Sequence, residues 1–362
     1  MTNFTLRCDI FCTVVDNYGD AGVCWRLARQ LALEHGWQVW LWIDDAAPLA
    51  QLAPGHDADP VEVRPWPADF PPVAADDIPD VVIEAFACAL PARYVETMAR
   101  RGKKPVWINF DHLSAESWVA ECHALPSPHP QLPLVKHFFF PGFTEETGGL
   151  LRERDYESRR QAFDEAAFRA EFGLPPRVPG ELTLSLFSYP HAPIQALLKA
   201  LAAADTPVHL LCPGSSEAPN RNGRLHIHPL PFLPQLRYDE LLWACDVNFV
   251  RGEDSFIRAQ WAGKPFVWQI YLQADDVHRV KLDAFLGLYE KVGAGTTAVD
   301  PTALAALIDF WHAWNGDGAI DWSRLAAALP QLAPHAQAWS EQLSQRPDLT
   351  TNLVQFCLER LK

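Results

Sequence analysis

The fold of this chain is decided by one stretch near its start, Asp9-Ile-Phe-Cys-Thr-Val-Val-Asp-Asn-Tyr-Gly-Asp-Ala-Gly-Val23. Residues 9–15 are largely apolar and β-branched, which is typical of a buried parallel strand. The loop 16–20 then collects turn-forming residues and two carboxylates. Beyond it, apolar residues recur at helical spacing as far as Gly36, and a second apolar run follows. This order predicts a βαβ unit, and such units bind ligands beyond the carboxyl ends of their strands.

The second half of the chain repeats this order. A strand at 182–187 precedes a loop and a helix, and a strand at 246–250 precedes the loop Arg251-Gly-Glu-Asp-Ser255. Between the two halves, residues 153–180 are rich in charge and then in proline, as interdomain linkers often are. We therefore predict two α/β domains with a cleft between them, residues 1–152 and 181–362, joined by the linker 153–180. The C-terminal helix is a candidate to pack back on the first domain.

Composition argues against several classes of protein. The net charge of −15 disfavours a nucleic-acid binder that relies on attraction to phosphate. No run of about 18 apolar residues is present, so no membrane span is expected. The eight cysteines are scattered without C-x-x-C spacing, and the N-terminus shows no signal peptide. These features predict a cytoplasmic protein with reduced thiols.

The sequence shows no convincing metal site. The histidines lack the spacing of metal ligands. Asp57-Ala-Asp59 matches the short acidic motif by which many sugar transferases hold a metal, but it lies in a proline-rich loop without a preceding strand. We therefore predict neither a metal nor another cofactor.

The first candidate site is the carboxylate pair Asp16 and Asp20. In a purely structural interpretation, one carboxylate caps the next helix and the other closes a turn. In a functional interpretation, the pair orients a cationic or proton-losing acceptor. The loop holds only Gly19 and Gly22, and its carboxylates would oppose a pyrophosphate, so it is no dinucleotide fingerprint. This lowers the case for a nucleotide-sugar dehydrogenase or epimerase.

The second candidate site is the loop Arg251-Gly-Glu-Asp-Ser255. Gly252 allows a tight turn, and Asp254 and Ser255 can cap the helix that follows. The free N–H groups of a helix start attract phosphate, and Arg251 could add positive charge. The alternative is a plain capped helix with a surface salt bridge.

A third group consists of residues that could hold a nucleobase. Phe187, Tyr189 and Tyr238 supply aromatic rings, and Gln235 supplies an amide. Aromatic residues at strand ends more often pack than bind ligands. Together, however, they could sandwich a base and form hydrogen bonds with it.

Taken together, these residues resemble a known family. Asp9–Leu31 is similar to the N-terminal signature of the bacterial protein-arginine rhamnosyltransferases that modify elongation factor P, the EarP family. Four later segments resemble further signatures of that family: Phe138–Thr144, Thr147–Glu153, Leu186–Tyr189 and Arg251–Phe256. The resemblance runs from about Asp9 to the helices near residue 290. The last 70 or so residues match only in helical character.

The resemblance implies an α/β fold of the GT-B type, with two facing Rossmann-like domains. It implies dTDP-β-L-rhamnose as donor, elongation factor P as protein partner, and metal-independent, inverting transfer of L-rhamnose that activates this factor. Carried over residue by residue, it places catalytic residues at Asp16, Asp20 and Glu253. The substrate-binding residues that we expect are Asn17, Tyr18, Gly19, Phe187, Tyr189, Gln235, Tyr238, Arg251, Gly252, Asp254 and Ser255. Tyr238 departs conservatively from a phenylalanine of the family.

An arginine acceptor poses a chemical problem, because its guanidinium has a pKa above about 12 and is a poor nucleophile. A carboxylate with a pKa near about 4 cannot remove that proton beforehand, but it can take it as the N–C bond forms. We assign this role to Asp20, and to Asp16 the holding of the guanidinium fork. Arg251 and the helix start ease departure of dTDP, and Glu253 positions the donor. The alternative function is a nucleotide-binding protein-interaction scaffold without transferase activity.

Overall fold

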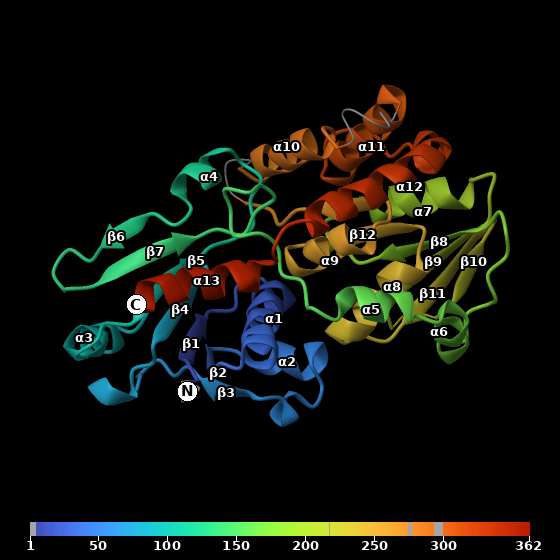
Figure 1. The fold of residues 1–362 in the computed structure, drawn as a ribbon. Coiled ribbons are helices and arrows are strands. Elements are labelled where there is room, and N and C mark those ends of the chain that lie inside the picture. The colour runs from blue at the N-terminus through green and yellow to red at the C-terminus, as the bar shows by residue number, and fades with distance from the viewer. Residues whose placement is uncertain (1–4, 217, 274–276, 293–299) are drawn as a thin grey trace. The chain divides into compact units, whose positions relative to one another are not determined.

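The computed structural model describes residues 5–216, 218–273, 277–292 and 300–362, with the side chain of Asn17 excepted. The chain divides into two compact units (Figure 1). Unit 1 comprises Met1–Arg154 and Arg346–Lys362, and unit 2 comprises Asp155–Gln345. Each unit is built on one mostly parallel sheet with helices packed against it.

The sheet of unit 1 has the strand order β3-β2-β1-β4-β5-β7-β6, and only β6 runs antiparallel to its neighbour. Its strands are β1 (Arg7–Cys12), β2 (Gln38–Ile43), β3 (Val61–Pro65), β4 (Val81–Ala85), β5 (Val106–Phe110), β6 (Pro126–Pro128) and β7 (Val135–Phe139). Its α-helices are α1 (Asn17–His35), α2 (Ala47–Leu52), α3 (Ala92–Arg100), α4 (Trp118–Cys122) and α13 (Leu349–Leu361). The strand order reverses between β1 and β4, and ligands of such sheets bind at the carboxyl ends of the strands at this switch point.

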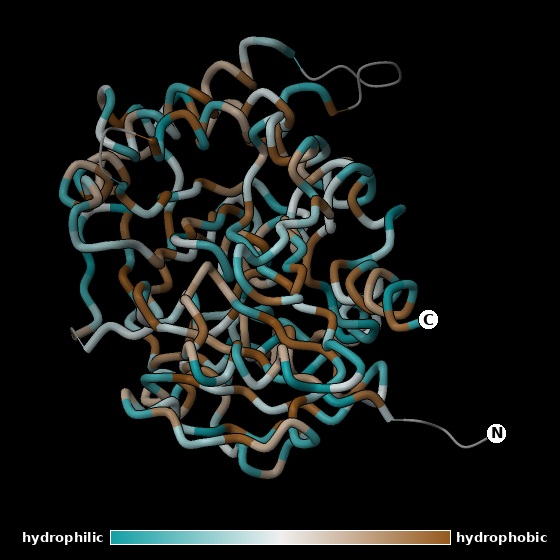
Figure 2. The backbone as a smooth tube through the Cα atoms, turned by 90° about the vertical axis from the view of Figure 1, so that its left-hand side faces the viewer, coloured by the Kyte–Doolittle hydropathy of each residue, from teal (hydrophilic) through white to brown (hydrophobic). Residues whose placement is uncertain are grey.

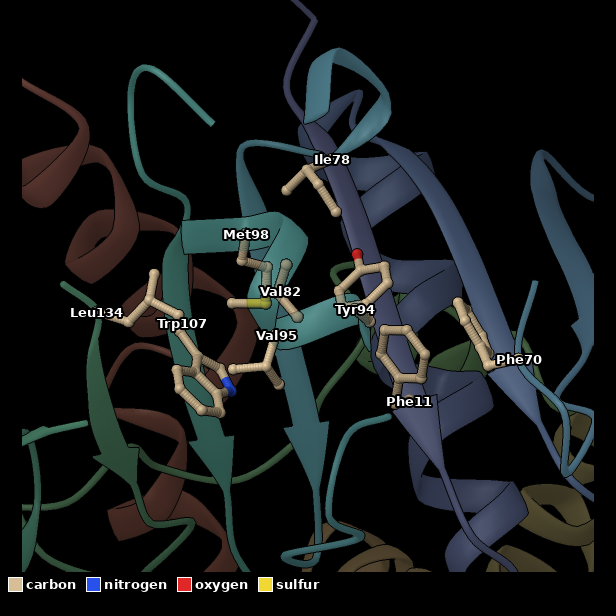
Figure 3. Close-up of a cluster of buried hydrophobic side chains, with 9 residues drawn as sticks. All are labelled: Phe11, Phe70, Ile78, Val82, Tyr94, Val95, Met98, Trp107 and Leu134. Carbon is tan, nitrogen blue, oxygen red and sulfur yellow. The ribbon is translucent and has the colours of Figure 1, made fainter. Parts of the chain in front are cut away.

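One part of the core of unit 1 lies between the sheet and α3 (Figure 3). Phe11, Val82 and Trp107 come from the neighbouring strands β1, β4 and β5 and pack with Tyr94 and Met98 of α3. Side chains of a strand alternate between its two faces, so each strand contributes to this layer at every second residue. The packing fixes β1 and β4 side by side and thereby places the loops that follow them.

Helix α13 belongs to unit 1 although it closes the chain. Gln30 of α1 donates a hydrogen bond from Nε2 to Asp348 Oδ1 at 2.9 Å, and its Oε1 accepts one from Thr350 Oγ1 at 2.9 Å. Hydrophobic and hydrophilic stretches alternate along this helix (Figure 2). Its apolar side, which includes Leu353 and Cys357, is buried. The segment the sequence offered as a candidate to pack on the first domain therefore lies on unit 1.

The sheet of unit 2 has the order β10-β11-β9-β8-β12-β13, with β10 alone antiparallel to its neighbour. Its strands are β8 (Leu182–Leu186), β9 (Val208–Pro213), β10 (Asn220–Asn222), β11 (Leu225–Leu230), β12 (Val247–Arg251) and β13 (Phe266–Gln269). Its helices are α5 (Tyr156–Gln161), α6 (Glu165–Glu171), α7 (Ile194–Ala202), α8 (Gln235–Ala244), α9 (Asp254–Ala262), α10 (Val277–Tyr289), α11 (Pro301–Trp314) and α12 (Trp322–Ser344). The parallel core repeats the order of unit 1, and its switch point lies between β8 and β12.

The segment 153–180, predicted as a linker, differs from that expectation. It contains α5 and α6, and from Asp155 onward it belongs to unit 2. Tyr156 and Phe168 are buried, and Arg169 donates from Nε to Pro175 O at 2.7 Å. Because each helix is short and its outer face is charged, the apolar residues that anchor it are too few to show a helical period.

Three helices begin earlier than the sequence predicted. Helix α1 begins at Asn17 rather than near Val23, α8 at Gln235 rather than Tyr238, and α9 at Asp254 rather than Phe256. Polar first turns hide the helical period, because the residues there face the end of the helix and not the core. Several predicted loop residues therefore lie in helix starts. Within the described residues, no helix combines the length and apolar character needed to cross a membrane.

Candidate functional site

The junction between β1 and α1 is organised by the carboxylate of Asp20. Its Oδ2 accepts hydrogen bonds from the backbone N–H groups of Val15 and Asp16, both at 2.8 Å. The side chain is buried, with 6% of its residue surface exposed. A carboxylate in the first turn of a helix is also favoured by the helix dipole. Asp20 thus closes the turn before α1, which is a role that the structural interpretation gave to one of the pair.

Asp16 occupies the N-cap position of α1 but makes no side-chain capping hydrogen bond. Its backbone carbonyl accepts from Gly19 N at 2.5 Å. A Cβ at Gly19 would come within 2.6 Å of Asp16 Oδ2, so glycine allows the Asp16 carboxylate to lie over the first turn. Gly19, a predicted site residue, therefore contributes by having no side chain, because this leaves room for the Asp16 carboxylate.

Tyr18 and Asn17 are the two other predicted residues of this junction. Tyr18 donates a hydrogen bond from its hydroxyl to Gln51 Oε1 of α2 at 3.0 Å. That contact ties the start of α1 to α2. The side chain of Asn17 lies outside the described part of the structure.

The junction between β12 and α9 is closed by backbone and hydroxyl hydrogen bonds. Arg251 N donates to Ser255 Oγ at 3.0 Å, and the Ser255 hydroxyl donates to the Arg251 carbonyl. Gly252 has a φ of 60°, in the left-handed region that favours glycine. Its carbonyl accepts from Trp268 Nε1 at 2.7 Å, and its N–H donates to Gln269 O at 3.1 Å. Ser255 therefore shapes the loop, and its predicted contact with the substrate stays a prediction.

The guanidinium of Arg251 lies against two predicted aromatic residues. Its Cζ is 4.3 Å from the ring centre of Phe187 and 4.7 Å from that of Tyr189. Its Nη1 donates to Ser188 O at 3.2 Å. The ends of β8 and β12 thus converge at the switch point of unit 2, and their side chains form a cationic, aromatic surface.

Helix α8 adds the remaining predicted residues of unit 2. Gln235 Nε2 donates to Asp254 Oδ2 at 3.0 Å, which joins the first turns of α8 and α9. The Tyr238 ring packs edge-on against Phe187, with 5.7 Å between ring centres. Burial raises the pKa of Tyr238, so its hydroxyl stays protonated. Glu253 is the N-cap residue of α9. All predicted residues of this half therefore lie in one neighbourhood.

Two features of this neighbourhood were missed by sequence reasoning. Asp239 and Arg258, both fully buried, form a two-pronged ion pair at 2.7 and 2.7 Å that ties α8 to α9. Gln269 Oε1 accepts from Tyr189 N at 2.6 Å. Asp239 and Arg258 each stand at helical spacing from an apolar residue, Leu242 and Trp261, which was a usable signal because buried charges need partners. Gln269, at the end of a strand, carried no such signal.

Possible metal donors do not cluster in the described residues of either unit. No group of three or more His, Cys, Asp or Glu side chains in them is arranged to hold a metal ion. At the two junctions, Asp20 and Asp254 accept hydrogen bonds from N–H groups.

Comparison with known proteins shows similarity to one protein family over nearly the whole chain. The sequence model of a family described as elongation factor P rhamnosyltransferase EarP matches residues 8–358. A protein-arginine rhamnosyltransferase of Pseudomonas putida is 47% identical, covering 96% of this chain and 97% of the relative. A solved structure from work on EarP-mediated arginine glycosylation of elongation factor EF-P has 36% identity and a TM-score of 0.68, covering 98% of this chain and 99% of that one.

A more distant likeness concerns the fold alone. The UDP complex of the Arabidopsis thaliana glycosyltransferase UGT89C1 has a TM-score of 0.59 at 12% identity, covering 99% of this chain and all of that one. Together with the two Rossmann-like sheets, these likenesses show a GT-B fold. The fold class predicted from the sequence is confirmed.

Proposed function

The chain belongs to the family of elongation factor P rhamnosyltransferases, EarP, and from this premise we propose that it transfers L-rhamnose from dTDP-β-L-rhamnose to an arginine of elongation factor P. The observation that carries the proposal is the pair of switch points. One presents two carboxylates, and the other presents a guanidinium on aromatic rings. A cationic acceptor and an anionic nucleotide donor require these opposite chemistries.

The donor is assigned to unit 2. Arg251 supplies positive charge for a diphosphate, and the start of α9 adds the favourable end of the helix dipole. Phe187 and Tyr238 offer aromatic faces for a base, and Gln235 offers an amide for hydrogen bonds. Asp254 is engaged by Gln235, so its role is to orient α8 or to meet the sugar. Glu253 is assigned to positioning of the donor.

The acceptor is assigned to unit 1. Asp20 Oδ2 is occupied by two N–H groups, which leaves Oδ1 as the oxygen that would take the proton as the N–C bond forms. The same two N–H bonds hold the carboxylate in one orientation. Asp16 lies at the neighbouring N-cap position and is assigned to the guanidinium fork. A water-poor site would strengthen both interactions.

We further propose that no metal is needed for departure of dTDP. The Arg251 guanidinium and the N–H groups of α9 provide positive potential where negative charge develops on the diphosphate. In this proposal they take the place that a bound cation would otherwise fill. Nothing in the structure favours the alternative of a scaffold without transferase activity.

The test is the intact mass of elongation factor P after incubation with the enzyme and dTDP-β-L-rhamnose. The expected result is a gain of one deoxyhexosyl group, located on an arginine by peptide fragmentation. Omission of the donor, and replacement of the modified arginine by lysine, serve as controls. No mass change under conditions in which the donor binds would contradict the proposed acceptor.

A further inference from the structure

The turn that follows β4 has an unusual backbone. Phe86, Ala87 and Ala89 have φ angles of 55°, 54° and 56°, and among the described non-glycine residues only Ala124 shares this conformation. Residues with a side chain adopt the left-handed region at a conformational cost. Such strain persists only where surrounding contacts impose it, and it gathers at functional sites. Three strained residues in one turn therefore indicate that neighbouring contacts impose this conformation.

The turn is held by contacts from three strands. Phe86 N donates to Phe110 O of β5 at 2.7 Å, and Cys88 Sγ donates to Phe11 O of β1 at 3.4 Å. Ala89 N donates to the buried carboxylate of Glu84 at 3.3 Å. Contacts to β1, β4 and β5 thus fix the backbone of the turn, and such support is what a strained conformation requires.

The turn also lies at the switch point of unit 1. Strand β4 pairs with β1, so the residues after β4 emerge beside the residues that lead to Asp16 and Asp20. The hydrogen bond from Cys88 Sγ to Phe11 O holds the turn against the end of β1. Strand β1 ends at Cys12, shortly before Asp16, so the turn lies at the same sheet edge as the predicted acceptor carboxylates.

The strained turn holds one aromatic ring in place. The Phe86 ring stacks on the imidazole of His112, with 4.3 Å between ring centres and 12° between planes. Phe110 supports Phe86 from the buried side, at 5.8 Å. His112 is exposed and Phe86 is half-buried. The outer face of the His112 imidazole is therefore the open face of this stack, at the sheet edge to which Asp16 and Asp20 also belong.

We infer that the Phe86–His112 stack is a platform for the flat face of the acceptor guanidinium, while Asp16 and Asp20 engage its edge. This inference rests on the proposed function. A guanidinium carries its N–H donors in its plane and is weakly hydrated on its faces, so it binds carboxylates edge-on and stacks on rings. An ammonium is compact, strongly hydrated and has no face to stack. The platform therefore favours arginine over lysine as acceptor.

The first test separates the π face from simple packing. Phe86→Leu keeps apolar bulk against Phe110 but removes the ring on which the His112 imidazole lies flat, whereas Phe86→Tyr keeps both. We expect Phe86→Leu to raise the KM for elongation factor P about 3- to 30-fold and Phe86→Tyr to leave it within about twofold. The Kd for dTDP should change in neither variant. An unchanged KM in Phe86→Leu, or an equal rise in both variants, would overturn the platform.

The second test uses two alanines in the same strained conformation. Ala124 has a φ of 65° and lies beside β6, four strands away from β1. Ala87→Gly and Ala124→Gly relieve similar strain, so their melting temperatures should respond alike. Only Ala87→Gly should lower kcat/KM for elongation factor P, by several-fold, because it frees the turn that orients Phe86. Equal activity of the two variants would contradict a positioning role for the turn.

A third measurement keeps this inference separate from the proposed function. Elongation factor P is titrated calorimetrically into each variant without donor. If the wild-type enzyme transfers no rhamnose, the proposed function fails, whatever the variants do. If the wild-type enzyme is active and Phe86→Leu binds elongation factor P as tightly as the wild-type enzyme, only the inferred platform is contradicted.

Discussion

The two strand–helix junctions of this protein share a topology and differ in what occupies the helix start. In unit 1, the carboxylate of Asp20 accepts the N–H groups of Val15 and Asp16. In unit 2, the neutral hydroxyl of Ser255 bridges the backbone of Arg251, whose guanidinium lies on aromatic rings. Both helix starts carry carboxylates, but only the second junction has a guanidinium beside them, and that cation can attract a phosphate.

This difference explains how one fold can serve two unlike substrates. Rossmann-like sheets bring ligands to the carboxyl ends of their strands in both units. The cation beside the helix start, which is Arg251 in unit 2, then distinguishes which ligand is favoured. The comparison predicts that changes at each junction affect one substrate and spare the other.

The largest effect is expected for Asp20→Asn. The amide oxygen can still accept the two N–H groups, so the junction should fold, but the side chain can no longer take a proton. Transfer of rhamnose should fall about 10²- to 10⁴-fold. Affinity for dTDP, measured by calorimetry, should stay within several-fold. Near wild-type transfer would remove Asp20 from the role of base.

Arg251→Ala should act on the donor side only. Loss of a charge-assisted contact of about 1.5–3 kcal/mol would weaken dTDP binding roughly 10- to 150-fold. Arg324→Ala is the matched control, since it removes one positive charge from α12 in the same unit, where Arg324 pairs with Asp309. Equal affinities in the two variants would place the donor elsewhere.

Ser255→Ala should have a smaller effect, because one neutral hydrogen bond contributes about 0.5–1.5 kcal/mol. We expect dTDP binding to weaken at most roughly tenfold. The structure indicates that the hydroxyl acts through the backbone of Arg251, so the double variant with Arg251→Ala should bind little worse than Arg251→Ala alone. Strictly additive losses would instead indicate direct contact with phosphate.

The two units also contain buried groups with opposite responses to pH. Burial raises the pKa of Asp9 in β1 from 3.8 to about 6, so its favourable contribution to stability is lost as pH rises through that range. Burial lowers the pKa of His228 in β11 from 6.5 to about 4, so its contribution is lost as pH falls through that range.

Melting temperatures between pH 4 and pH 7 test this pair of shifts. As pH rises, the melting temperature of Asp9→Asn should increase relative to that of the wild-type protein. The melting temperature of His228→Gln should decrease relative to that of the wild-type protein. Parallel curves for both variants would show that neither group titrates between the folded and unfolded states as inferred.

The smallest effect is expected for a chelator. If Arg251 and the helix start provide the positive potential for dTDP departure, activity should be unchanged in EDTA. The measurement is the rate of elongation factor P modification before and after dialysis against the chelator. Loss of activity that magnesium or manganese restores would show that the donor half needs a cation.

Much of this organisation follows from sequence pattern. The alternation of apolar strands and helices predicts both sheets, because burial of one face imposes its period locally. The residues at the strand ends identify both junctions, since turn formers and charges must leave the core there. Helix starts were misplaced at Asn17, Gln235 and Asp254 because polar first turns do not contribute to that period.

The sequence by itself determined which residues stand at the two junctions and the chemistry they carry. The tertiary structure decided their partners: Asp20 turns back to its own helix start, Ser255 closes its own loop, and Arg251 lies on rings more than 60 residues away. It also produced the strained turn at Phe86, which no local pattern predicts. The reason is physical: periodicity reports burial along one element, whereas these contacts depend on which strand ends the sheet order brings together.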